Sequence, residues 1–95
     1  TSAADDIPLS PAFGRETVYI SAREYWRRPF EEYFEGLEKI FMQHGGRPHW
    51  GQIHTQDAAQ LRKLYPEFET FTALRQEMDP QGIFLNPYLE KVLIG

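Results

Sequence analysis

Only one stretch of this 95-residue chain, residues 17–22, has the β-branched and aromatic composition of a clear strand. Residues 47–54 predict a second short strand, and residues 83–85 predict a short extended piece. Two or three short strands do not make a stable sheet without partners. We therefore expect an α+β fold, in which a small antiparallel sheet is covered by helices on one face and continues into further polypeptide.

The strongest helix signal covers residues 29–44. Pro29 has the fixed φ that suits the first position of a helix. Apolar side chains then recur at spacings of three and four residues, while Glu and Lys occupy the opposite face. Gly45 and Gly46 permit the left-handed backbone that commonly ends a helix, so we expect the helix to stop there.

The second half of the chain predicts three shorter helices, over residues 56–64, residues 67–78 and residues 87–92. Thr55 is a suitable N-cap for the first of them. The sequence Asp-Pro-Gln-Gly at 79–82 predicts a turn after the second. Asn86 is the expected N-cap of the third, with Pro87 in its first position.

Composition and charge exclude several classes of function. The chain has no cysteine, which excludes disulfides and thiol metal sites. Its net charge of −4 gives no electrostatic footprint for nucleic acid. No apolar run approaches the roughly 20 residues that cross a bilayer. The aromatic content of 15% is high, and it indicates a packed core, with some rings against a larger partner or a pocket.

The three histidines, His44, His49 and His54, are spaced by five residues and do not suggest a metal site. Metal ligands must converge on one point, whereas a spacing of five along a strand places two side chains on opposite faces. The chain also lacks nucleotide-binding, zinc-protease and nucleophile-elbow motifs.

Residues 45–52, with the sequence Gly-Gly-Arg-Pro-His-Trp-Gly-Gln, are the most unusual stretch. One interpretation is a corner between a helix and a strand, with a packed Trp50 and a hydrogen-bonded His49. The other is a site where Gly51 allows a bulge or the close approach of a ligand. The residues alone leave both open.

This stretch, together with Asp-Pro-x-Gly-x-Phe-Leu-Asn-x-Tyr-Leu at 79–89, resembles the C-terminus of the aldonolactone oxidases. That group includes L-gulono-1,4-lactone, D-arabinono-1,4-lactone and alditol oxidases, which are flavoproteins of the vanillyl-alcohol oxidase type. Residues 4–11 and 15–20 also resemble the family, so the likeness covers essentially the whole chain.

The resemblance implies that residues 1–95 form the C-terminal part of a ferredoxin-like substrate (cap) domain plus a C-terminal tail. FAD would be bound mainly by a separate domain of the same protein, which has no counterpart in this sequence. The implied reaction transfers a hydride from a sugar 1,4-lactone or an alditol to the flavin, which oxygen or another acceptor reoxidises. The isolated chain is predicted to be inactive.

The resemblance also implies a catalytic pair. His49 matches the His of a His-Trp-x-Lys motif and would lie beside the flavin and the substrate. Gln52 stands where the family usually has Lys, and an amide donates only neutral hydrogen bonds. Since these two side chains would point to opposite faces of a regular strand, we predict an irregularity at Gly51.

Four further site residues follow from the same resemblance. Trp50 and Asn86 are the expected cofactor contacts, and Arg23 and Ser21 the expected substrate contacts. Simpler interpretations are an N-cap for Asn86 and a solvated charge for Arg23. We expect a cytoplasmic protein, and peripheral membrane association, known for some relatives, is left open. The alternative function is a non-catalytic module that binds carbohydrate or protein through its aromatic side chains.

Overall fold

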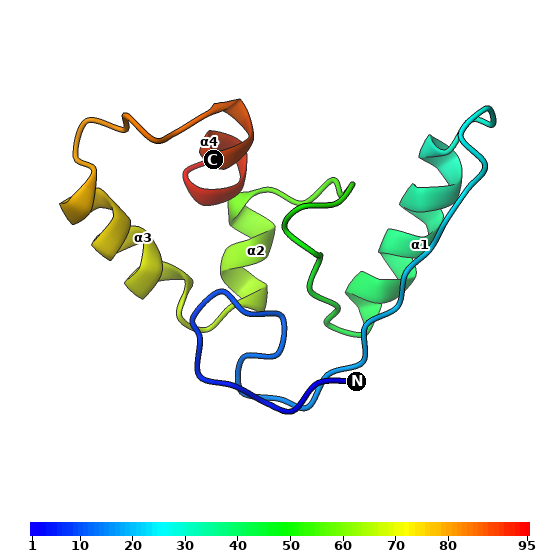
Figure 1. The fold of residues 1–95 in the computed structure, drawn as a ribbon, viewed down its shortest axis with the longest axis horizontal. Coiled ribbons are helices and arrows are strands. Elements are labelled where there is room, and N and C mark those ends of the chain that lie inside the picture. Colours follow the sequence, from blue (N-terminus) through cyan, green and yellow to red (C-terminus); the bar gives the residue numbers. More distant parts are fainter.

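The computed structural model describes residues 1–95 as four helices joined by irregular segments (Figure 1). In chain order these are α1 (Glu31–Gln43), α2 (Ala58–Leu64), α3 (Phe68–Met78) and α4 (Pro87–Leu93). Figure 1 shows α1 on one side, and α2, α3 and α4 gathered on the other. None of the helices has the length and apolar character that crossing a bilayer would require.

The hydrophobic core lies where α2, α4 and the start of α3 meet. Its six buried residues are Ala58, Leu61, Tyr65, Phe68, Val92 and Leu93. Burial of a side chain such as Leu61 or Phe68 contributes about 1.5–3 kcal/mol to stability. Helix α1, by contrast, has no buried residue. The stable centre of the chain is therefore its second half, to which α1 is attached.

The end of α1 is fixed by two glycines, as predicted. Gly45 has a φ of 66°, and its N–H donates to the carbonyl of Met42 at 3.0 Å. The N–H of Gly46 donates to the carbonyl of Phe41 at 2.7 Å, which closes the helix end. A Cβ at position 46 would lie 2.8 Å from that same carbonyl oxygen, so only glycine fits there.

The caps of the shorter helices match the prediction in one case and not in the other. Asn86 caps α4, because its Oδ1 accepts from the N–H of Leu89 at 2.8 Å. The prediction that Thr55 caps α2 is wrong. Asp57 and Gln60 form a capping box there instead, each side chain accepting from the other's backbone N–H at 3.0 Å.

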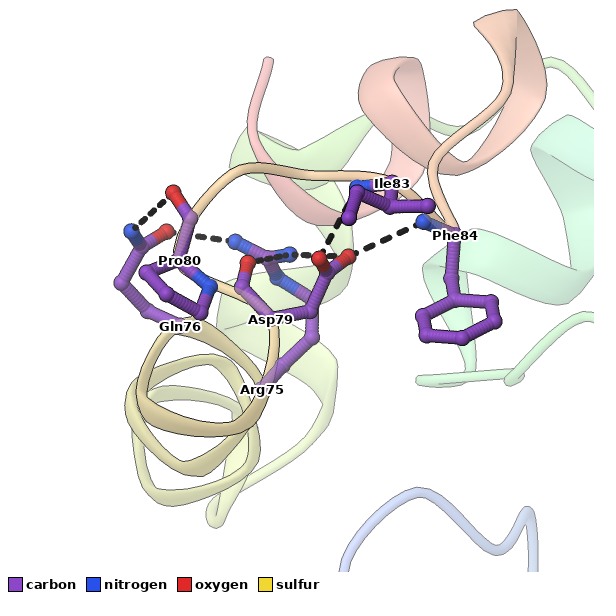
Figure 2. A network of polar contacts seen from close by, with 6 residues as sticks. All are labelled: Arg75, Gln76, Asp79, Pro80, Ile83 and Phe84. Atoms are coloured by element: carbon purple, nitrogen blue, oxygen red, sulfur yellow. Dashed lines mark hydrogen bonds and ion pairs between the residues drawn. The ribbon is translucent and has the colours of Figure 1, made fainter.

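The predicted turn at 79–82 is present, and Asp79 holds it together (Figure 2). The N–H of Gly82 donates to the carbonyl of Asp79 at 3.1 Å. The carboxylate of Asp79 accepts from the N–H groups of Ile83 and Phe84 at 2.8 and 3.0 Å. Arg75 lies 3.7 Å from the same carboxylate. Residues 83–85 consequently form a second turn, and the prediction of an extended piece there is wrong.

The two predicted strands do not form within these residues. Residues 18–22 are irregular and make no backbone–backbone hydrogen bonds. Val18 and Ile20 remain two-thirds exposed, at 66% and 67%. The physical reason is the absence of a neighbouring strand, since the only ladder contacts are isolated bridges near the N-terminus. An α+β fold with a small sheet stays a prediction, because it depends on strand partners outside this chain.

Residues 47–54 bend at their centre instead of running as a strand. The N–H of Gln52 donates to the carbonyl of His49 at 3.1 Å and closes a turn that contains Gly51. The strand prediction is therefore wrong for this segment, whereas the predicted irregularity at Gly51 is confirmed. We call residues 47–52 the corner.

Candidate functional site

A groove with a volume of about 660 Å³ lies between α1 and the two irregular segments that flank it. This volume falls within the range of roughly 300–1,000 Å³ that is usual for small-molecule sites. The apolar part of its wall includes Val18, Ile20, Phe34, Leu37, Phe41 and Ile53. The polar part includes Glu38, His49, Gln52, His54 and Gln56. Such a lining suits a ligand that is flat or apolar in part and carries polar groups at one edge.

His49 enters this groove from the corner with its ring orientation fixed. The N–H of Gly51 donates to Nδ1 of His49 at 3.1 Å. A neutral imidazole whose Nδ1 accepts must carry its proton on Nε2. His49 therefore presents Nε2–H as a donor, and no other protein group occupies that nitrogen.

Gln52 lines the same groove, because the turn brings it to the same side as His49. Its side chain is exposed and makes no hydrogen bond within the chain. The two arginines that line the groove are held by backbone carbonyls: Arg15 by Gly45 at 2.8 Å, and Arg47 by three carbonyls at 2.8 to 3.1 Å. Neither arginine is free to supply the positive charge that the resemblance implies at position 52.

The other four predicted site residues do not line the groove. Arg23 and Ser21 are exposed on the irregular segment beside α1. Trp50 packs toward the core: its indole N–H donates to the carbonyl of Leu9 at 2.9 Å, and its ring lies 5.4 Å from that of Tyr65. Asn86 caps α4. The packing and capping interpretations thus describe Trp50 and Asn86 in this structure.

Sequence reasoning missed the link between α1 and the segment after the corner. Glu38 accepts from the backbone N–H and the hydroxyl of Thr55 at 2.9 and 2.6 Å, and from the side chain of Gln56 at 2.8 Å. Burial opposes its ionisation, but these hydrogen bonds outweigh burial and hold the pKa of Glu38 below its usual value. Gln56 is buried, and its Oε1 has no partner. Since Glu38 is 17 residues from Thr55, no local pattern indicates this contact.

A second missed group connects α4 with the corner. The hydroxyl of Tyr88 lies 2.6 Å from the carbonyl oxygen of Trp50 and 2.9 Å from Nε2 of His54. Because a carbonyl only accepts, Tyr88 donates to Trp50 and accepts from His54. Burial lowers the pKa of His54, nearby Glu38 opposes this effect, and Lys91 adds to it. Nδ1 of His54 is buried without a partner, which also favours the neutral ring.

A smaller groove of about 410 Å³ lies between α3, α4 and the turn before α4. Its walls are almost wholly apolar and include Phe71, Leu74, Met78, Leu85 and Leu89. No group of three His, Asp or Glu side chains is arranged to hold a metal ion anywhere in the chain. The larger groove is therefore the candidate site, since of these two grooves it is the one that combines apolar walls with several polar groups.

Comparison with known proteins gives a consistent result. A profile of the D-arabinono-1,4-lactone oxidase family matches residues 1–92. The L-gulono-1,4-lactone dehydrogenase of Mycobacterium tuberculosis is 48% identical over 92 residues, which are 97% of this chain and 22% of that protein. The L-gulonolactone oxidase of Scyliorhinus torazame is 44% identical, over 93% of this chain and 21% of the relative.

The alditol oxidase of a Streptomyces species is 38% identical over the whole of this chain and 23% of its own length. No solved structure matches significantly. The chain spans about a fifth of the length of the curated relatives that it matches. A family match over nearly all of its residues, supported by relatives of this identity, shows that the chain belongs to the D-arabinono-1,4-lactone oxidase family.

Proposed function

We propose that this chain is the C-terminal part of the substrate domain of an FAD-dependent enzyme that oxidises a sugar 1,4-lactone or an alditol. The observation that carries the proposal is the turn at Gly51, which brings His49 and Gln52 into one groove of ligand size. Family membership supports the reaction class, because the relatives are oxidases and dehydrogenases of sugar lactones and alditols.

The residues of the groove fit one edge of a flat, partly polar ring such as that of a flavin. The apolar walls would cover the ring, and Nε2–H of His49 and the amide of Gln52 supply donors at its edge. When bound, the flavin supplies the acceptor for the hydride that leaves the substrate carbon. Trp50 would contribute by packing, since its indole N–H already donates to the carbonyl of Leu9. Asn86 caps α4 through Oδ1, so its Nδ2 group would be free to donate to the cofactor.

The chain's own part in the reaction would be to hold the substrate oxygen that loses its proton. His49, with its proton on Nε2, would donate to that oxygen, and the hydroxyl proton would leave to water or to a base outside this chain. Gln52 adds a second neutral donor where the family usually has a positive charge. Preorganised donors of this kind stabilise developing negative charge, each by about 2–4 kcal/mol in well-studied hydrolases.

The proposal includes a flavin-binding domain in the same protein as the main partner, and a cytoplasmic location. Residues 18–22 support the proposal of a partner domain. Their exposed apolar side chains and unpaired backbone groups would suit addition as a strand to a sheet of that domain. In that sheet, Ser21 and Arg23 would share one face and are proposed substrate contacts. The isolated chain is expected to be inactive.

The test is made on the full-length protein that carries this chain. We expect a yellow preparation that releases FAD or holds it covalently, and that turns over members of a panel of aldonolactones and alditols. Peroxide formation and dye reduction, measured in parallel, identify the electron acceptor. A colourless protein without turnover on the panel would remove the oxidoreductase proposal.

The second candidate is a non-catalytic module that binds carbohydrate. It is favoured by Gln52, which removes the usual positive charge, and by Trp26, which is 76% exposed beside Tyr25. Sugar binding by a flavin-free protein, abolished by Trp26→Ala, would support this reading over the enzyme.

A further inference from the structure

The peptide group that joins Trp50 to Gly51 is hydrogen-bonded at both of its polar atoms. Its carbonyl oxygen accepts from the hydroxyl of Tyr88 at 2.6 Å. Its N–H donates to Nδ1 of His49 at 3.1 Å. Both atoms belong to one planar unit, so a contact that fixes the direction of the carbonyl also fixes the direction of the N–H.

We propose that Tyr88 is a positioning residue for His49, which it holds, through this one peptide plane, in the tautomer with the proton on Nε2. The inference rests on the proposed function, since it gives Tyr88 a part in that same site. Tyr88 does not line the groove and would touch neither substrate nor cofactor. Its effect on His49 passes only through the Trp50–Gly51 peptide.

His54 and Asn86 set the position of Tyr88 in turn. The hydroxyl of Tyr88 has a single proton, and the Nε2–H of His54, 2.9 Å away, occupies its acceptor side. The proton of Tyr88 is thereby directed to Trp50. Asn86 caps α4 two residues earlier and so fixes the first turn, from which Tyr88 extends. Asn86 thus gains a role in the site that does not require contact with a ligand.

A bridge that merely holds α4 against the corner would use the same atoms, but it predicts a different result. A structural bridge affects stability alone. A positioning role also affects which nitrogen of His49 carries the proton, because loss of the Tyr88 contact frees the peptide to rotate and removes the donor to Nδ1. The tautomer of His49 is therefore the observation that separates the two.

The experiment uses the full-length protein with ¹⁵N-labelled histidine, whose ring signals distinguish protonated from unprotonated nitrogens. The His49 signals are assigned by their loss in His49→Gln. We expect one tautomer in the unmodified protein and a mixture in Tyr88→Phe. With sugar substrates, kcat should fall on the order of tenfold in Tyr88→Phe, while KM and flavin content stay unchanged.

Tyr33→Phe is the matched control. Tyr33 is 44% exposed, close to the 39% of Tyr88, but its hydroxyl makes no hydrogen bond and it lies outside the groove. The proposal is overturned if Tyr88→Phe leaves the His49 tautomer unchanged, or if Tyr33→Phe alters it equally.

Should Tyr88→Phe fail to fold, His54→Gln provides the second variant. It removes the imidazole that directs the hydroxyl of Tyr88, so we expect a partial mixture at His49, and an unchanged tautomer there contradicts the proposal. A protein that holds no flavin and turns over no sugar would instead refute the proposed function. The response of the His49 signals to Tyr88→Phe remains readable in that case, so the two failures are distinct.

Discussion

Glu38 of α1 accepts two hydrogen bonds from Thr55, one from the backbone N–H at 2.9 Å and one from the hydroxyl at 2.6 Å. Together with the contact from Gln56, they join α1 to the segment that leads from the corner into α2. Because α1 has no buried residue, this polar contact carries much of the attachment between the two walls of the groove.

Replacement Glu38→Gln should therefore loosen this attachment. Hydrogen bonds to a charged acceptor contribute about 1.5–3 kcal/mol each, and the amide turns one acceptor into a donor that faces other donors. We expect faster hydrogen exchange at the amide of Thr55, equivalent to about 1–3 kcal/mol of lost local stability. Glu35→Gln is the control, since Glu35 lines the same groove without a hydrogen bond. Equal exchange in the two variants would show that Glu38 has no special part.

The pH dependence of the corner should follow His54. Its pKa is lower in the folded protein than the ordinary value of 6.5, so below that value the unfolded state binds more protons. Stability contributed by the neutral ring is present above pH 6.5 and is lost as pH falls through 6.5 toward the folded pKa.

Hydrogen exchange at Gln52, whose N–H donates to the backbone carbonyl of His49, measured on both sides of pH 6.5, checks this prediction. His54→Gln should make the exchange, corrected for its intrinsic pH dependence, flat in that window. The lowered pKa of Glu38 gives a loss of stability only below its usual 4.5, so the two groups act in different windows. If His54→Gln keeps the full pH dependence of exchange near 6.5, a group other than His54 causes that dependence.

Replacing Gly36, inside α1, and Gly46, just after it, should change the stability of the protein in opposite directions. Gly46→Ala places a Cβ 2.8 Å from the carbonyl oxygen of Phe41 and should cost about 1–3 kcal/mol. Gly36→Ala meets nothing within 4 Å inside α1 and should stabilise by about 0.5–1 kcal/mol. Thermal unfolding of both variants measures the difference. Similar shifts of the same sign would contradict the geometry of the helix end.

Gln52→Lys tests whether this position acts on charge. A lysine in the groove would stabilise a negative oxygen in the transition state better than an amide does. We therefore expect the activation barrier to fall by up to about 2–4 kcal/mol and kcat to rise accordingly. Gln43→Lys, which adds the same charge at an exposed position outside the groove, should leave kcat unchanged. Turnover that is indifferent to Gln52→Lys would count against the assignment of His49 and Gln52 as a pair.

The helices could be predicted because their signals are local. The apolar spacing predicts α1, and Asn86 followed by Pro87 predicts the start of α4. Gly45 predicts the left-handed end of α1. The prediction for Thr55 is wrong because its hydroxyl donates to Glu38 instead of capping α2. The apolar pattern of α1 places Glu38 on the solvent face, so it does not indicate this contact. The Asp-x-x-Gln spacing of Asp57 and Gln60 is a local signal that identifies the true cap.

The strand predictions are wrong for a different reason. A strand is stabilised by a neighbour, and residues 18–22 have β-forming side chains but no neighbour among these 95 residues. In the site, His49 and Gln52 followed from the family resemblance and the irregularity at Gly51 from the geometry of a strand. Tyr88 and His54 lie 34 residues apart, so their contact with the corner depends on tertiary structure that no short motif encodes.

The lack of any buried residue in α1 has a consequence for ligand binding. One wall of the groove is anchored to a hydrophobic core, and the other is tethered to it by polar contacts that water can replace. A molecule seated between them would supply apolar contact area that the polypeptide itself lacks. Occupancy and rigidity are thus coupled here, so that melting temperature and proteolytic resistance of α1 become direct measures of whether the groove is filled.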